Sequence, residues 1–147
     1  MRARVGILAA ILAIAPASAR AEAVVGAGPV ARADDRGRGT GVETTVGIRL
    51  ATRGEVSGWW HVTGAVARSV EEEAREVRVG PRVWRCAGGV CLGLAADVGL
   101  AEVRVGALAT DRALVDARAL IAVDLDRAAR VALVASAGAR GTLDLSW

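Results

Sequence analysis

The chain has 147 residues, which is enough for a single domain. It contains no Lys, Asn, Gln, Tyr or Phe, and arginine supplies all 19 basic residues against 16 acidic ones. The formal net charge is only +3, so the pI near 10 reflects arginine as the sole strong base and not a basic patch. This balance gives no reason to expect nucleic acid as a partner.

The N-terminus has the three parts of a secretory signal. Residues 1–4 are basic, residues 5–15 form an apolar run, and Ala17-Ser18-Ala19 or Ala21-Glu22-Ala23 provides a small-x-small cleavage site. The run is too short to anchor a protein permanently in a bilayer. We therefore expect a signal peptide over residues 1–19, with cleavage after Ala19 or alternatively after Ala23, and a secreted mature protein.

The segment after the signal shows no sustained hydrophobic period. Residues 20–39 are rich in Ala, Gly and Arg and include Pro29. This composition predicts a flexible linker. The folded domain is then expected over residues 40–147.

A first hairpin is expected at the start of this domain. From Gly41 to Ala51 apolar and polar residues alternate throughout, as in a half-buried β-strand. A second strand follows the turn at Arg53-Gly54-Glu55, where Gly54 suits the positive φ of a three-residue loop. This loop places Ile48 opposite Trp60, Val46 opposite Val62, and Val42 opposite Val66.

The segment from Ser69 to Arg78 is highly charged. Its Ser-x-x-Glu start is compatible with a short helix. We favour a charged turn, with Glu71, Glu72 and Glu73 as its solvated tip.

A central hairpin is predicted from Val77 to Leu100, folded about Cys86-Ala-Gly-Gly-Val-Cys91. If the two cysteines face each other, one side of this hairpin is wholly apolar and the other carries both cysteines. The predicted pairs are Val83 with Leu94, Val79 with Val98, Val77 with Leu100, Trp84 with Gly93, and Arg82 with Ala95, with Asp97 diagonal to Arg82. In an oxidising compartment this pair predicts a disulfide between Cys86 and Cys91.

Two further strands follow. The apolar phase shifts between Leu100 and Val103, which predicts a bulge in one long strand or, as the less favoured alternative, a very tight extra turn. A turn near Thr110-Asp111-Arg112 leads into a strand that carries its charges on one face and its apolar side chains on the other. The last strand folds back about Arg127-Ala128-Ala129. The predicted pairs are Leu125 with Val131, Val123 with Leu133, Ile121 with Ala135, Asp116 with Arg140, and Asp126 with Arg130.

These elements predict an all-β fold, an antiparallel meander of about six and possibly eight strands that forms a small or incomplete β-barrel. One face is apolar and the other is polar, which leaves two arrangements open. In a water-soluble barrel the apolar face is the core. In an outer-membrane barrel the apolar face meets lipid and a charge network fills the lumen. This network comprises Glu43, Arg49, His61, Arg78, Arg82, Asp97, Asp116, Arg118 and Asp124.

The chain ends with Gly141-Thr142-Leu143-Asp144-Leu145-Ser146-Trp147. This ending resembles the terminal strand of bacterial outer-membrane β-barrel proteins, in which alternating apolar residues and a final aromatic form an assembly signal. The resemblance implies that Leu143, Leu145 and Trp147 form this signal. It also implies the outer membrane of a Gram-negative bacterium as the location, with outer-membrane lipid and the barrel-assembly machinery as partners, and it allows a homo-oligomer.

Catalysis is not expected. His61 is the single histidine, no serine lies in a G-x-S-x-G elbow, and no phosphate loop is present. No cofactor or metal is indicated, because C-x4-C is not a zinc spacing and nothing marks out carboxylate ligands. The leading hypothesis is an outer-membrane barrel with a structural or surface role. The alternative is a soluble periplasmic barrel that binds a hydrophobic ligand.

Overall fold

The computed structural model describes residues 4–14, 23–34, 37–125 and 131–145, all of them in strands or the turns between strands. The strands are β1 (Arg4–Ile14), β2 (Ala23–Asp34), β3 (Gly37–Arg53), β4 (Val56–Arg68), β5 (Glu73–Ala87), β6 (Val90–Val105), β7 (Leu108–Asp124) and β8 (Val131–Leu145).

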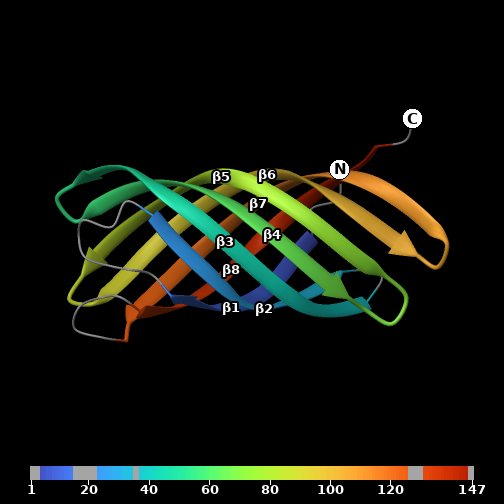
Figure 1. Ribbon diagram of the computed structural model, residues 1–147, viewed down its shortest axis with the longest axis horizontal. Coiled ribbons are helices and arrows are strands. Elements are labelled where there is room, and N and C mark those ends of the chain that lie inside the picture. The colour runs from blue at the N-terminus through green and yellow to red at the C-terminus, as the bar shows by residue number, and fades with distance from the viewer. Residues whose placement is uncertain (1–3, 15–22, 35–36, 126–130, 146–147) are drawn as a thin grey trace.

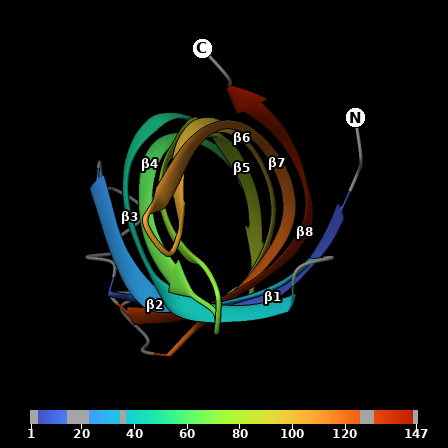
Figure 2. The ribbon, with the colours of Figure 1, turned by 90° about the vertical axis from the view of Figure 1, so that its right-hand side faces the viewer.

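Strands β2 to β8 form one antiparallel sheet in which each strand pairs with the next along the chain. The sheet is strongly curled, so that its two edge strands come round toward each other (Figure 2). β1 lies between these edges and pairs with β8 along its length and with β2 at Ala9–Val30 and Leu12–Ala27. The all-β antiparallel meander predicted from the sequence is therefore confirmed.

The turns gather at two ends of the sheet (Figure 1). The β4/β5 and β6/β7 turns lie at the end that also holds the last residues of β8, which we call the terminal end. The β3/β4 and β5/β6 turns lie at the opposite end, which we call the disulfide end. Every strand crosses from one end to the other at a steep tilt.

The registers predicted for the first two hairpins are confirmed. In β3 and β4, Ile48 pairs with Trp60 and Val46 with Val62. The turn itself differs, because Arg53 pairs with Val56 and leaves a two-residue loop in place of the expected three. An irregularity between Arg49 and Ala51 takes up the extra residue and restores the predicted register.

The central hairpin matches every predicted pair, with Cys86 opposite Cys91, Val83 opposite Leu94 and Arg82 opposite Ala95. Its two-residue loop has Gly88 at φ 60° and Gly89 at φ 84°. Both angles lie in the left-handed region that a type I′ turn requires and that glycine adopts without strain.

The predicted pairs between the last two strands are confirmed where both residues are described: Val123 with Leu133, Ile121 with Ala135, and Asp116 with Arg140. The Asp126–Arg130 pair lies outside the described residues. The turn expected near Thr110 is wrong. The chain reverses at Gly106, whose φ of 58° suits a tight turn.

The predicted bulge after Leu100 is also wrong. The pairing of β6 with β5 and with β7 keeps one register through this segment. Ala101 and Val103 instead face the interior, where they pack with Ala74 and Leu114. The apolar phase shifts because the lining of the interior changes from charged to apolar near the terminal end.

The predicted linker is a strand over most of its length. Residues 23–34 form β2, which pairs with β3 from Ala23–Ile48 to Asp34–Gly37. Its small side chains hid the alternation, although exposed and more buried positions alternate from Ala23 to Ala31. Pro29 is compatible with this strand because β2 is an edge of the seven-stranded sheet, where a missing backbone N–H is tolerated.

The six strands predicted from the sequence correspond to β3 to β8, and β2 makes seven. The apolar run assigned to a signal peptide coincides with β1. Both proposed cleavage sites include residues outside the described part of the chain.

Candidate functional site

The curled sheet buries its charged face and exposes its apolar face. Along β3, Glu43 is 1% exposed, whereas its neighbour Val42 is 57% exposed. The same inversion holds on other strands, where Arg78 and Asp97 are buried and Val77 and Val98 are exposed. Because an ordinary soluble domain buries its apolar residues, this inside-out pattern is the feature that a function has to explain.

Arg78 of β5 is the centre of the buried charges. Its guanidinium donates hydrogen bonds to the carboxylates of Glu43 on β3 and Asp116 on β7. Its Nε lies 3.7 Å from Oε2 of Glu76 on its own strand. One arginine thus joins carboxylates from three strands.

Two further arginines extend this arrangement. Arg118 of β7 donates to Oε1 of Glu43 at 3.1 Å and to Oδ2 of Asp97 at 2.5 Å. Arg140 of β8 donates to Oε1 of Glu76 at 2.7 Å and to Oδ2 of Asp116 at 3.2 Å. We call these seven residues, Glu43, Glu76, Arg78, Asp97, Asp116, Arg118 and Arg140, the interior network.

The interior network links strands that are not neighbours in the sheet. The Arg118–Glu43 pair joins β7 to β3, and the Arg140–Glu76 pair joins β8 to β5. Such charge-assisted hydrogen bonds are strong when the surroundings exclude water. The network therefore holds opposite walls of the curled sheet together.

Two buried side chains lie beside the network. His61 of β4 is 2% exposed, and its Nε2 is 2.9 Å from Oδ1 of Asp97, although the angle does not make a good hydrogen bond. Arg82 of β5 is 9% exposed, and its Nε and Nη2 have no hydrogen-bond partner among the described residues. Nε of Arg78 and Nε of Arg118 also lack a hydrogen-bond partner there, but each of these arginines donates two hydrogen bonds to carboxylates of the network.

Inward-facing glycines make room for these long side chains. A Cβ on Gly138 would lie 2.6 Å from Cγ of Arg118, and one on Gly99 would lie 2.9 Å from Cγ of Arg78. On β6, a Cβ at Gly93 would lie 2.6 Å from the indole of Trp84. The interior is therefore filled by large side chains packed against glycine on the neighbouring strand.

Small apolar clusters lie toward both ends of the interior. Near the terminal end, Leu114 packs with Ala74, Ala101 and Val103. Near the disulfide end, Ala122 and Val134 pack with Trp84 and Cys91.

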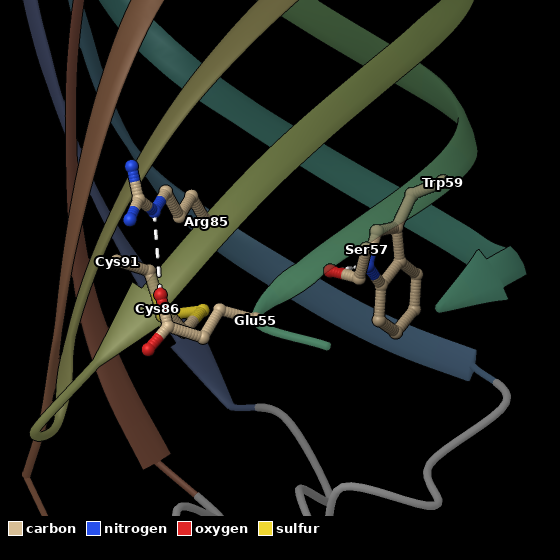
Figure 3. Close-up of a disulfide and its surroundings, with 6 residues drawn as sticks. All are labelled: Glu55, Ser57, Trp59, Arg85, Cys86 and Cys91. Atoms are coloured by element: carbon tan, nitrogen blue, oxygen red, sulfur yellow. Dashed lines mark hydrogen bonds and ion pairs between the residues drawn. A yellow bond between two sulfur atoms is a disulfide. The ribbon is translucent and has the colours of Figure 1, made fainter. Parts of the chain in front are cut away.

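Figure 3 shows the disulfide end from close by. Cys86 and Cys91 form the predicted disulfide, with their Cα atoms 4.0 Å apart. Nε1 of Trp59 donates to Oγ of Ser57 at 3.0 Å, and Arg85 forms an exposed ion pair with Glu55.

Most of the residues predicted to line a lumen meet in one place. Glu43, Arg78, Asp97, Asp116 and Arg118 are in the network, and His61 and Arg82 adjoin it. Two others lie nearer the disulfide end. Arg49 has Cζ 5.9 Å from the ring centroid of Trp59, and the backbone N–H of Asp124 donates to the carbonyl of Gly89.

The sequence analysis missed Glu76 and did not count Arg140 as an interior residue. Glu76 shares the parity of Arg78 and Arg82, so it would have been found if the charged segment before Val77 had been interpreted as strand. Of the predicted assembly signal, Leu143 is exposed and Leu145 is half-buried, while Trp147 lies outside the described residues.

The described residues contain no group of three or more His, Cys, Asp or Glu side chains that could hold a metal ion. They also contain no helix long and apolar enough to cross a membrane. No family model, no curated protein and no solved structure matches the chain.

Proposed function

We propose that the protein is a small outer-membrane β-barrel with a structural or surface role and no catalytic activity. The observation that carries the proposal is the inverted burial, in which ion-paired side chains such as Arg78 and Asp116 fill the interior while large apolar side chains cover the outside. A β-barrel in lipid has this distribution, because its outer face meets hydrocarbon and its inner face does not.

The height of the outer apolar band supports this proposal. On β5 the outward positions between Arg75 and Arg85 are Val77, Val79, Pro81 and Val83. Arg75 and Arg85 are ten residues apart, which is about 33 Å along a strand and about 25 Å along the barrel axis at a tilt of about 40°. This is the usual height of the apolar band on outer-membrane barrels, about 25 Å.

Neighbouring strands have the same boundary. On β6 the outward positions from Val90 to Leu100 are free of charge, and Glu102 and Arg104 follow near the terminal end. On β4 the outward positions from Val56 to Val66 are likewise uncharged before Arg68. The band is thus bordered by charged side chains where headgroups would lie.

We further propose that the barrel is closed by eight strands. In an antiparallel meander β2 and β8 run in the same direction, so a strand that pairs with both in antiparallel fashion has to lie between them. β1 has this direction and pairs with both edges. Closure matters because an open edge in lipid leaves backbone groups without partners.

The filled interior favours a structural role over transport. Glu43, His61 and Arg78 are each no more than 2% exposed, and apolar clusters lie toward both ends. An aqueous channel requires a wider barrel than eight strands supply. The soluble ligand-binding alternative needs an apolar interior, and the interior network fills that space with charge.

Fractionation of Gram-negative cells that export the full chain behind an added cleavable signal sequence tests the proposal, because the β1 residues are then retained. We expect the protein in the outer membrane, with faster gel migration when it is not heated. Deletion of Trp147 is expected to reduce recovery in that fraction. Recovery from the soluble periplasm, unaffected by this deletion, would contradict the proposal.

The outward position of Trp60 provides a second readout. Trp60 is 42% exposed and lies in the apolar band, whereas its neighbour Trp59 points to the other face. Brominated lipid chains should quench the fluorescence of Trp60 in reconstituted vesicles. Replacement of Trp60 by Leu should remove most of this quenching, and replacement of Trp59 by Leu should not.

A further inference from the structure

Three arginines lie on one row of paired residues that runs round the interior. The row passes from Arg49 through Trp59 to Arg82 and then through Ala95 to Arg118. We call it the arginine row. Between its second and third arginines stands only the small side chain of Ala95.

Carboxylates are distributed unevenly about this row. Those of the interior network lie on its terminal side, where they bind Arg78, Arg118 and Arg140. On the disulfide side, Glu55 and Asp124 are the described carboxylates, and Glu55 is exposed and paired with Arg85. Among the described residues, the arginine row therefore has fewer carboxylates on its disulfide side than on its terminal side.

Among the described residues, Arg118 has one buried donor without an acceptor, its Nε, and Arg82 has two. The two of Arg82 are its Nε and Nη2. A guanidinium stays charged at any ordinary pH, so this group cannot escape the cost of burial by losing a proton. Buried donors without partners in a native protein usually mark a bound water or ion.

The neighbours of Arg82 favour an ion over water alone. Arg118 and Arg78 repel its charge, while Asp97 and Glu43 attract it without accepting a hydrogen bond from its Nε or Nη2. The ring nitrogens of His61, on the adjacent strand, are also buried without a well-formed hydrogen bond. A small anion would accept hydrogen bonds and offset the repulsion together.

We propose that Arg82 is the anchor of a binding site for a small monovalent anion, a halide or a small carboxylate, within the arginine row. The disulfide end is the nearer end of the sheet, because Arg82 lies only three residues from the exposed Arg85 at the border of the apolar band. The site depends on the curled fold and not on the membrane that the protein occupies. A test of the anion site is therefore independent of the proposed outer-membrane location.

Iodide quenching of tryptophan fluorescence tests this site. The protein is refolded in detergent with Trp60 and Trp147 each replaced by Leu, so that the remaining indoles are Trp59, the register partner of Arg82, and Trp84. Iodide is titrated at constant ionic strength maintained with sodium sulfate, whose divalent anion is outside the proposed ligand class. We expect quenching that saturates and that chloride reverses by competition. Quenching that rises linearly with iodide and ignores chloride would overturn the proposal, because it indicates random collision with a site that holds only water.

Variants identify the anchor. Arg82→Met keeps the volume and removes the charge, and we expect it to abolish saturation. Arg82→Lys keeps the charge, and we expect saturation at about tenfold higher iodide, a loss of about 1.4 kcal/mol. Arg85→Gln removes an arginine from the outer face of the same strand and should leave the iodide response unchanged.

Saturation preserved in folded Arg82→Met, judged by gel migration before heating, would also overturn the proposal. If Arg82→Met does not fold, the proposal is judged by the protein that keeps Arg82: saturating quenching supports the anion site, and linear quenching overturns it.

Discussion

At the scale of single residues, the largest losses of stability are expected where a carboxylate of the interior network binds more than one arginine. Glu43 receives hydrogen bonds from Arg78 and Arg118, which come from different strands. Replacement of Glu43 by Gln leaves two buried guanidinium groups short of one negative charge. We expect the free energy of unfolding to fall by about 3–5 kcal/mol, as for other broken buried ion pairs.

Urea unfolding in detergent micelles measures this loss, and the chain offers a matched control. Glu55→Gln removes a carboxylate from the exposed pair with Arg85, and we expect a change below about 1 kcal/mol. Equal losses in the two variants would mean that burial does not set the energy of the network.

The glycines of the interior lead to a second prediction. A Cβ on Gly138 would overlap the carbonyl oxygen of Ala117 and lie 2.6 Å from Cγ of Arg118, so Gly138→Ala has to displace the neighbouring strand as well as an arginine that holds two carboxylates. We expect destabilisation by about 1–3 kcal/mol, the usual cost of overpacking. Gly58→Ala is the control, because a Cβ there meets nothing within 4 Å. Thermal melts of both variants compare the two sites, and equal melting temperatures would contradict the tight packing.

At the scale of elements, the hairpins could be predicted because two patterns had to agree. In the central hairpin, the alternation on two strands and the Gly88-Gly89 turn all specify the one register that places Cys86 opposite Cys91. β2 could not be predicted in this way, since its alanines and glycines carry almost no alternation. The sequence also does not indicate which face of the sheet lies inside. One face is apolar and the other polar, and either one can line a barrel.

The candidate site was partly predictable for the same reason. Period-two parity alone assigns Glu43, Arg78 and Asp116 to one face. It does not specify which charged residues meet across the interior, since the Arg118–Glu43 pair joins strands that lie far apart in the chain. Such contacts depend on the curvature of the whole sheet.

The disulfide is expected to stabilise its hairpin only modestly. Cys86 and Cys91 are five residues apart, and so short a loop gains about 2 kcal/mol from cross-linking. We therefore expect the variant with both cysteines replaced by Ala to fold with the same register and a slightly lower midpoint in urea. Loss of the folded species, judged by gel migration before heating, would show that the bond is required for assembly and not only for stability.

At the scale of the whole molecule, the decisive quantity is the number of strands. A sheet of β2 to β8 has edges that run in the same direction, and its closure without a further strand requires a parallel seam in an otherwise antiparallel sheet. β1 is antiparallel to both edges and would remove this requirement; its described pairs with β2 are Ala9–Val30 and Leu12–Ala27. We therefore propose that β1 closes the sheet into a barrel by pairing with both edges.

Removal of β1 tests this conclusion. We compare the full chain with one that begins at Arg20, both refolded from urea into detergent micelles. The full chain should be a monomer whose gel migration changes on heating. The shortened chain exposes the edges of β2 and β8, and we expect it to associate through them, because unpaired edges bind other strands. Cysteines introduced at Leu12 and Leu133, which are register partners on β1 and β8, should cross-link within one full chain. If the shortened chain were an equally stable monomer, seven strands would close the barrel by themselves.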